Sequence, residues 1–293
     1  MHNNNGHAIH CEGNPRAIKV LMYHRVVDDR KISDKHWTSV HVDDFRRQLE
    51  LLEQWGFTPI TFRDYRLFLE GRLDLPKKPI ILTFDDGYLD TYEVAFPVMQ
   101  EFGFKAVIFV LGDKNVKTNY WDHNPEIPDA PLMNGRQIVE MHEAGFEIGS
   151  HSLSHPRLTE LTEDQTWEQI CRSRILLEIL LDAPVHTISY PFGLINDSIK
   201  EATKHAGYRF GCGVGSGPAI FGDDHFEIRR ITILGRTTAA GFALRLLTPF
   251  QYYEWTRRKA GDAFRGTFKP VKGNGHKQEV LEPQSVDAEQ KSL

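Results

Sequence analysis

Residues 79–87 read Pro-Ile-Ile-Leu-Thr-Phe-Asp-Asp-Gly, an apolar run that ends in two adjacent carboxylates and a glycine. A continuous run of branched apolar residues is typical of a strand buried on both faces in a parallel sheet. Asp85 and Asp86 would then lie at the carboxyl end of that strand, where successive side chains point in different directions. One carboxylate could therefore bind a cation while the other faces a substrate, and Gly87 allows the tight turn that follows.

A second polar run follows the strand-like segment 145–150: residues 151–155 read His-Ser-Leu-Ser-His. Histidines four residues apart share one face of a helix or a tight turn. Two imidazoles and one carboxylate leave positions open, which is typical of a catalytic site for zinc or a similar divalent metal that can activate water near neutral pH. Each run also has an ordinary interpretation. Adjacent aspartates before a glycine commonly form a simple turn, and the second run lacks the glutamate that follows the first histidine in zinc proteases.

The wider pattern predicts an α/β fold, because strand-like and helix-like segments alternate from residue 17 to about residue 247. Helices are expected at residues 43–55 and from Thr162, which opens a capping box with Gln165, to about residue 181. Asn134 and Asn196 are expected to cap two more helices. Many short strand–helix units favour a closed or nearly closed barrel, in which chemistry lies at the carboxyl ends of the strands. The expected strands are residues 18–26, 79–84, 106–111, 146–150, 187–190, 208–212 and 226–233.

Length and composition indicate one main domain. A chain of 293 residues with 40% hydrophobic content can bury a single large core, which we expect within residues 17–250. We expect residues 1–16 to be flexible and the polar segment 251–293 to be disordered. The net charge of −5 provides no basic field, so nucleic acid is not an expected partner.

The cysteines and the amino terminus bear on the compartment. Three widely spaced cysteines without a Cys-x-x-Cys pair indicate a reducing compartment or simple core positions. The first fifteen residues lack the apolar core of a secretory signal, and no segment reaches the length of a membrane span. A cytoplasmic location is the expectation from these features, and a secreted or periplasmic one would apply to a chain that has lost a leader.

A long loop at residues 114–132 carries Trp121. Loops of this length on a barrel face commonly carry binding residues. Trp121 could stack on a sugar ring, or it could attach the loop to the body of the domain.

The two polar runs, followed by Tyr190-Pro191-Phe192-Gly193, resemble the first three motifs of the polysaccharide deacetylases, carbohydrate esterase family 4. The resemblance covers residues 18 to about 234. It implies a distorted (β/α)7 barrel and a metal-dependent hydrolase that removes acetyl groups from N-acetylhexosamine units of a carbohydrate and releases acetate. It assigns Asp86, His151 and His155 to the metal and Asp85 to the general base. Zinc is the expected metal, and cobalt, nickel and iron are alternatives because they accept similar ligands.

The third motif would contribute to substrate binding. The backbone N–H of Phe192 is the expected donor to the oxyanion that forms when water attacks an amide carbonyl. Tyr190, Pro191 and Trp121 are the expected substrate-binding residues.

The chain departs from the common family pattern in two places. Ser189 stands where an arginine usually braces the general base. Arg229 or Arg230 could replace that arginine, although surface or structural pairing is the favoured interpretation of both.

The second departure is that no Leu-x-His-Asp run follows the third motif, so the usual general acid is missing. Leu21-Met22-Tyr23-His24 resembles the opening of the branch that deacetylates poly-N-acetylglucosamine-type exopolysaccharides, in which this motif is displaced to the start of the domain. His24 is therefore the expected general acid, and a core or strand-end histidine is its alternative role.

Two other functions remain open at this point. Ser189 and the absent motif also suit a carbohydrate-binding protein that has lost its activity. The missing leader also suits an O-acetyl esterase or an amidase that acts on a small or lipid-linked acetylated molecule.

Overall fold

The computed structural model describes residues 18–122, 129–214, 221, 224–249, 253 and 256. The expected flexible segment 1–16 lies outside the described residues, and so does the expected disordered tail 251–293 apart from residues 253 and 256.

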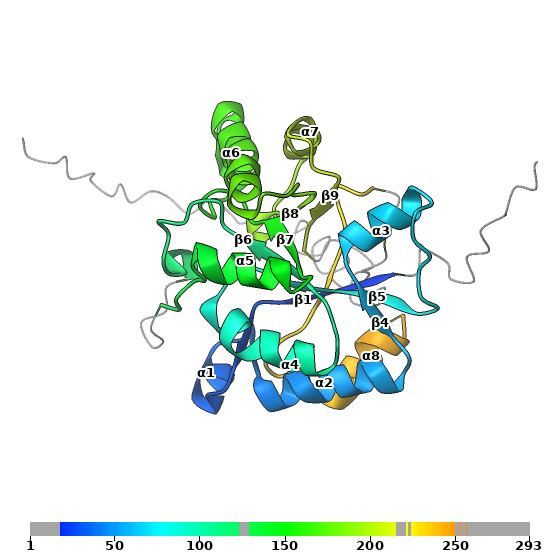
Figure 1. Ribbon diagram of the computed structural model, residues 1–293. Helices are drawn as coiled ribbons and strands as arrows, with labels where there is room; N and C mark the ends of the chain where they lie inside the picture. Colours follow the sequence, from blue (N-terminus) through cyan, green and yellow to red (C-terminus); the bar gives the residue numbers. More distant parts are fainter. Residues whose placement is uncertain are drawn as a thin grey trace, which may run out of the picture. The chain divides into compact units, whose positions relative to one another are not determined.

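An eight-stranded parallel sheet forms the centre of the fold, and helices surround it (Figure 1). The strand order is β10-β1-β5-β6-β7-β8-β9, and β4 pairs with the first half of β5. The strands are β1 (Lys19–Tyr23), β4 (Thr58–Ile60), β5 (Pro79–Phe84), β6 (Val107–Val110), β7 (Glu147–Ser150), β8 (Thr187–Ser189), β9 (Phe210–Cys212) and β10 (Ile231–Thr232). The α-helices are α1 (Arg30–Lys35), α2 (Val42–Gln54), α3 (Phe62–Leu69), α4 (Phe96–Glu101), α5 (Gly135–Glu143), α6 (Glu163–Leu181), α7 (Asp197–His205) and α8 (Ala239–Leu247).

The sheet curves into a half-barrel, and the segment after β9 connects its two edges. Ile228 pairs with Cys212 of β9, and Ile231 of β10 pairs with Leu21 of β1. Residues 228–231 therefore run from one edge of the sheet to the other. This arrangement confirms the expected distorted α/β barrel and places the first and last strands side by side.

The expected strand at residues 18–26 is divided at His24. Its first part is β1 of the main sheet, and its second part is β2 (Arg25–Val27), which pairs with β3 (Ser39–His41) in a separate two-stranded sheet. The sequence did not predict β3 or β4, because three residues are too few to show a period. The last expected strand, 226–233, is reduced to the two residues of β10.

The expected helix starts are confirmed. The side chain of Thr162 accepts a hydrogen bond from the N–H of Gln165, whose side chain accepts one from the N–H of Thr162. Asn134 caps α5, and Asn196 caps α7. None of the described helices has the length and apolar character needed to span a bilayer.

Strand β5 is buried on both faces, as its apolar run predicts. Ile80, Leu82 and Phe84 belong to the larger apolar cluster, whereas Ile81 belongs to the second cluster together with Phe109. Because strand side chains alternate, Thr83 and Asp85 follow Ile81 on the same face. This alternation directs Asp85 toward the interior of the half-barrel.

Candidate active site

Three candidate metal ligands converge at the carboxyl ends of β5 and β7. Oδ1 of Asp86 lies 3.2 Å from Nε2 of His151 and 3.1 Å from Nε2 of His155. All three ligand atoms lie within 4.8 Å of one another, and all three residues are buried. Two imidazole nitrogens and one carboxylate oxygen at this spacing fit a divalent ion and leave coordination positions open.

Unusual backbone conformations hold these side chains in place. Asp86, Ser152, His155 and Phe192 all have positive φ angles, and among the described non-glycine residues only Asp182 shares this property. Residues held in the left-handed region are concentrated at functional sites, where the surrounding structure compensates for the strain. The two histidines therefore reach the site from a tight turn and not from a helix.

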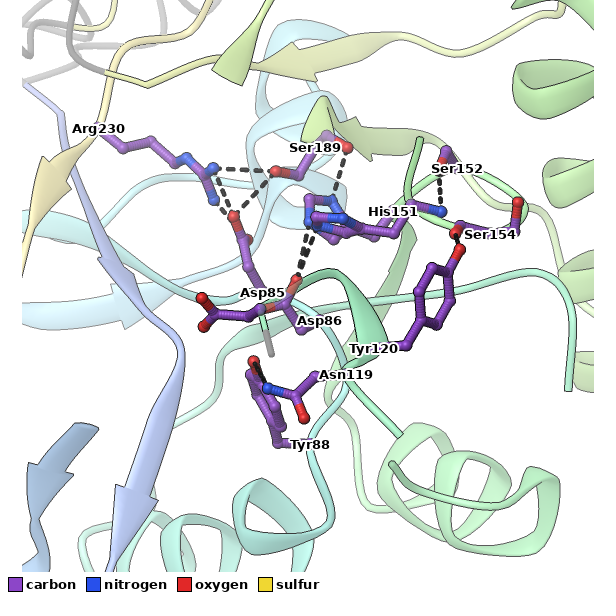
Figure 2. Close-up of polar contacts among 12 residues, drawn as sticks. Asp85, Asp86, Tyr88, Asn119, Tyr120, His151, Ser152, Ser154, Ser189 and Arg230 are labelled. Atoms are coloured by element: carbon purple, nitrogen blue, oxygen red, sulfur yellow. Dashed lines mark hydrogen bonds and ion pairs between the residues drawn. The ribbon is translucent and has the colours of Figure 1, made fainter. Parts of the chain in front are cut away.

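Hydrogen bonds hold the turn and orient one imidazole. The hydroxyl of Ser152 accepts from the N–H of His155 at 3.0 Å, and its carbonyl accepts from the hydroxyl of Ser173 on α6 at 2.9 Å. Nδ1 of His151 bonds the carbonyl of Ser189 at 2.8 Å, which directs Nε2 toward Asp86 (Figure 2). Such a second bond fixes the tautomer and the ring orientation of a ligand histidine.

Asp85 is braced by Arg230, contrary to the favoured interpretation of that arginine. Nη1 and Nη2 of Arg230 lie 2.7 Å from Oδ1 and Oδ2 of Asp85, and the hydroxyl of Ser189 donates to Oδ2 at 3.1 Å (Figure 2). The segment 228–231 that joins the sheet edges carries Arg230 over the interior, where its side chain is fully buried. Burial by itself would raise the pKa of Asp85, but the charge and hydrogen bonds of Arg230, together with the nearby imidazoles of His151 and His24, hold the pKa below its ordinary value. Asp85 is therefore a carboxylate at neutral pH.

His24 lies beside Asp85 because of the sheet register. Tyr23 pairs with Phe84, and the N–H of Asp85 donates to the carbonyl of Tyr23 at 3.0 Å. The residues that follow this pair, His24 after β1 and Asp85 after β5, therefore lie next to each other. His24 lines one pocket with Asp85 and Asp86. Nδ1 of His24 is buried and has no hydrogen-bond partner among the described residues. A core histidine would have its ring satisfied, so this feature favours a role toward a ligand.

The pocket over these groups has a volume of about 260 Å³. Its walls combine acidic, imidazole and aromatic side chains. The lining residues are Met22, His24, Trp37, Thr38, Asp85, Asp86, Trp121, Asp122, His151, His155, Tyr190, Phe192, Gly193 and Val214.

Comparison with known proteins agrees with this geometry. A family model described as polysaccharide deacetylase matches residues 72–211. The chain contains a polysaccharide deacetylase domain. The chain is 24% identical over 233 residues to the poly-β-1,6-N-acetyl-D-glucosamine N-deacetylase of Staphylococcus epidermidis, an alignment that covers 73% of this chain and 78% of the relative.

Two solved structures are similar to the deacetylase. The Streptococcus pyogenes deacetylase PplD in complex with acetate has a TM-score of 0.68 and 25% identity, and the match covers 80% of this chain and 99% of that chain. The Bacillus cereus polysaccharide deacetylase BC0361 has a TM-score of 0.64 and 27% identity, with 78% of this chain and 68% of that chain covered. The predicted family, fold and hydrolase class are thereby confirmed.

The three predicted substrate-binding residues and the predicted oxyanion donor, Phe192, lie in different environments. Tyr190 lines the pocket, but its hydroxyl donates to the carbonyl of Phe226 at 3.1 Å, away from the metal ligands. Pro191 is buried and does not line the pocket. The N–H of Phe192 donates to no backbone carbonyl of the described residues. The ring of Trp121 stacks on that of His155, with the centroids 4.1 Å apart.

The sequence alone did not assign three residues of the site: Arg230, which holds Asp85, and Trp37 and Asp122, which line the pocket. Arg230 had a signal, since a charged residue between the apolar positions Ile228 and Ile231 indicates a buried ion pair. Asp122 had only the general signal of the long loop 114–132, and Trp37 had none, because only the folded chain brings its segment to the pocket.

Proposed function

We propose that this deacetylase removes acetyl groups from N-acetylhexosamine units of a polysaccharide or oligosaccharide and releases acetate. The observation that carries the proposal is a single pocket that unites the Asp86, His151 and His155 triad with Asp85 and His24. The name of the Staphylococcus epidermidis relative and the acetate in the Streptococcus pyogenes structure support the same chemistry.

The proposed metal ligands are Asp86, His151 and His155, and zinc is the proposed ion, with cobalt, nickel or iron as alternatives. A bound divalent ion supplies Lewis-acid polarisation of the acetamide carbonyl and lowers the pKa of water. The donor set fits this role because both imidazoles present Nε2 to the same carboxylate oxygen. Trp121, stacked on His155, would hold that ring and keep bulk water from it.

Asp85 is the proposed general base. Both of its oxygens are held by Arg230 and Ser189, so the carboxylate keeps one orientation without free rotation. It would accept a proton from the attacking water, since the guanidinium keeps it ionised before the reaction.

His24 is the proposed general acid, and Phe192 the proposed oxyanion donor. The amine that leaves on cleavage of an amide needs a proton, and His24 lies on the Asp85 side of the pocket with one buried ring nitrogen uncommitted. Phe192 lines the pocket from the 3-10 turn Pro191–Gly193, where it has a φ of 58°, and its N–H would donate to the oxyanion. Tyr190 and Pro191 would therefore act by shaping this turn.

The proposed catalytic unit corresponds to the predicted domain at residues 17–250. The matched family region, 72–211, excludes both His24 and Arg230. Because β1 and β10 pair, these two residues still belong to the same site.

An acetate-release panel tests the proposal. The protein would be assayed with defined added metals on N-acetylated and O-acetylated glycans beside an Asp85→Asn variant. We expect metal-dependent release from N-acetylhexosamine oligomers and loss of release in the variant. Release from O-acetyl substrates alone would establish an esterase instead, and bound metal without release from any substrate would establish a binding protein.

A further inference from the structure

We infer that the mouth of the active-site pocket binds a hexosamine unit that carries a free amino group, next to the acetylated unit to be cleaved. The enzyme would thus prefer a partly deacetylated chain. This inference rests on the proposed function and concerns three residues that the catalytic steps do not use: Trp37, His36 and Asp122.

The charges that line the pocket favour a cation at its mouth. The described lining residues include three aspartates and three histidines but no lysine or arginine. Asp85 is paired with Arg230, and Asp86 faces the two imidazoles. Of the three aspartates among the described lining residues, Asp122 is the one that neither pairs with Arg230 nor faces His151 and His155.

Asp122 is held in place with one oxygen left over. Its Oδ2 lies 2.7 Å from Nε2 of His36, and Nδ1 of His36 lies 2.9 Å from the hydroxyl of Thr38. The hydroxyl can donate to Nδ1 while Nε2–H donates to the carboxylate, so both ring nitrogens of His36 have a partner. Oδ1 makes no hydrogen bond to a described residue, and the side chain is 44% exposed. A charged acceptor therefore faces the pocket in a fixed orientation.

Trp37 supplies an aromatic surface beside this carboxylate. Trp37 is 65% exposed although its neighbours His36 and Thr38 are buried at 6% and 5%. Its carbonyl accepts from the N–H of Gly235 at 2.9 Å, so the backbone is anchored while the ring faces solvent at the pocket. Exposed aromatic faces attract both apolar sugar faces and cations.

The His36–Asp122 bond also joins the two segments that carry the tryptophans. His36 precedes Trp37, and Asp122 follows Trp121, which stacks on His155. The segment that carries Trp37 is therefore fixed relative to His155, one of the proposed metal ligands. A sugar unit bound at Trp37 and Asp122 would lie beside the unit at the catalytic groups.

Asp122 would distinguish a sugar unit with a free amine from one with an acetamide. An ammonium donates a charge-assisted hydrogen bond to a carboxylate, whereas an acetamide donates a neutral and weaker one. The surplus of about 1 kcal/mol corresponds to about a fivefold preference.

The test compares N-acetylglucosamine pentamers that are fully acetylated with pentamers of which about half of the units have been chemically deacetylated. The assay runs at a pH that keeps free amines protonated, and the measured quantity is kcat/KM per acetyl group. We expect the unaltered enzyme to favour the mixed pentamer about fivefold. Asp122→Asn should bring this ratio close to one, and added salt should lower it. The matched control is Asp34→Asn, an exposed aspartate of α1 that does not line the pocket, and this variant should keep the ratio.

A ratio near one in the unaltered enzyme, or a preference that survives Asp122→Asn, would overturn the inference while leaving the proposed function intact. Acetate release from neither pentamer would instead reject the proposed function. In that case, calorimetric binding of a fully deacetylated pentamer to the full-length protein still tests the mouth. Salt-sensitive binding that Asp122→Asn weakens supports the inference, and no binding overturns it. Should Asp122→Asn fail to fold, the ratio and its salt dependence in the unaltered enzyme decide.

Discussion

Replacement of Arg230 by methionine tests the brace of the proposed general base. The pair with Asp85 is almost completely inaccessible, with side-chain exposures of 0% and 3%, and both nitrogen–oxygen distances are 2.7 Å. Removal of one partner of such a pair leaves an uncompensated buried charge and costs about 3–5 kcal/mol. For a domain of this size we expect a fall in Tm of about 6–20 °C, which thermal unfolding monitored by circular dichroism would measure.

The same replacement should change the pH dependence of catalysis. Without the guanidinium, burial dominates the ionisation of Asp85 and its pKa rises. Because the base must be ionised, the acid limb of the kcat/KM profile should move to higher pH. Arg230→Lys retains the charge but not the two parallel bonds, so it should restore the position of this limb more than the rate.

Two further variants test whether Arg230 braces Asp85. Arg229→Met is the matched control, because Arg229 is 32% exposed and its ion-pair partner among the described residues is Glu227, at 3.2 Å; its loss should cost less than about 1 kcal/mol. Combining Arg230→Met with Asp85→Asn removes both charges and should recover part of the lost stability. A stable Arg230→Met variant with an unshifted pH profile would show that Arg230 does not brace the base.

Three further predictions follow from other parts of the molecule. His24→Ala should lower kcat by about 10²- to 10⁴-fold without changing the metal content measured by mass spectrometry, and a near-normal rate would exclude it as general acid. Chelation should abolish acetate release and lower Tm, zinc should restore both, and Asp86→Ala should prevent that restoration; chelator-resistant release would contradict the metal site. Burial raises the pKa of Glu147 from 4.5 to about 7, so its contribution to stability is complete below 4.5 and declines as the pH rises through 7, by up to about 3 kcal/mol. Urea unfolding at several pH values should show this decline, Glu147→Gln should remove it, and an equal decline in both proteins would assign it to other groups.

Local patterns were sufficient to predict the end of β5 and to single out the proposed metal ligands. The apolar run before Asp85 predicted β5, and the spacing of His151 and His155 predicted a shared ligand position, because strand alternation and turn geometry act over a few residues. The capping signals at Thr162 and Asn134 succeeded for the same reason. The three-residue strands β3 and β4 escaped prediction, since their existence depends on pairing with distant parts of the chain.

The sequence by itself indicated the family resemblance, the barrel class, the proposed metal ligands and the proposed base, because each of these is carried by a short local motif. Only the tertiary structure decided that Arg230 braces Asp85, across 145 residues of chain, and that Trp37 and Asp122 share the mouth of the pocket. The physical reason is the curvature of the sheet. Its two edges are joined by residues 228–231, and this closure directs an inward arginine toward a carboxylate whose position no local pattern specifies.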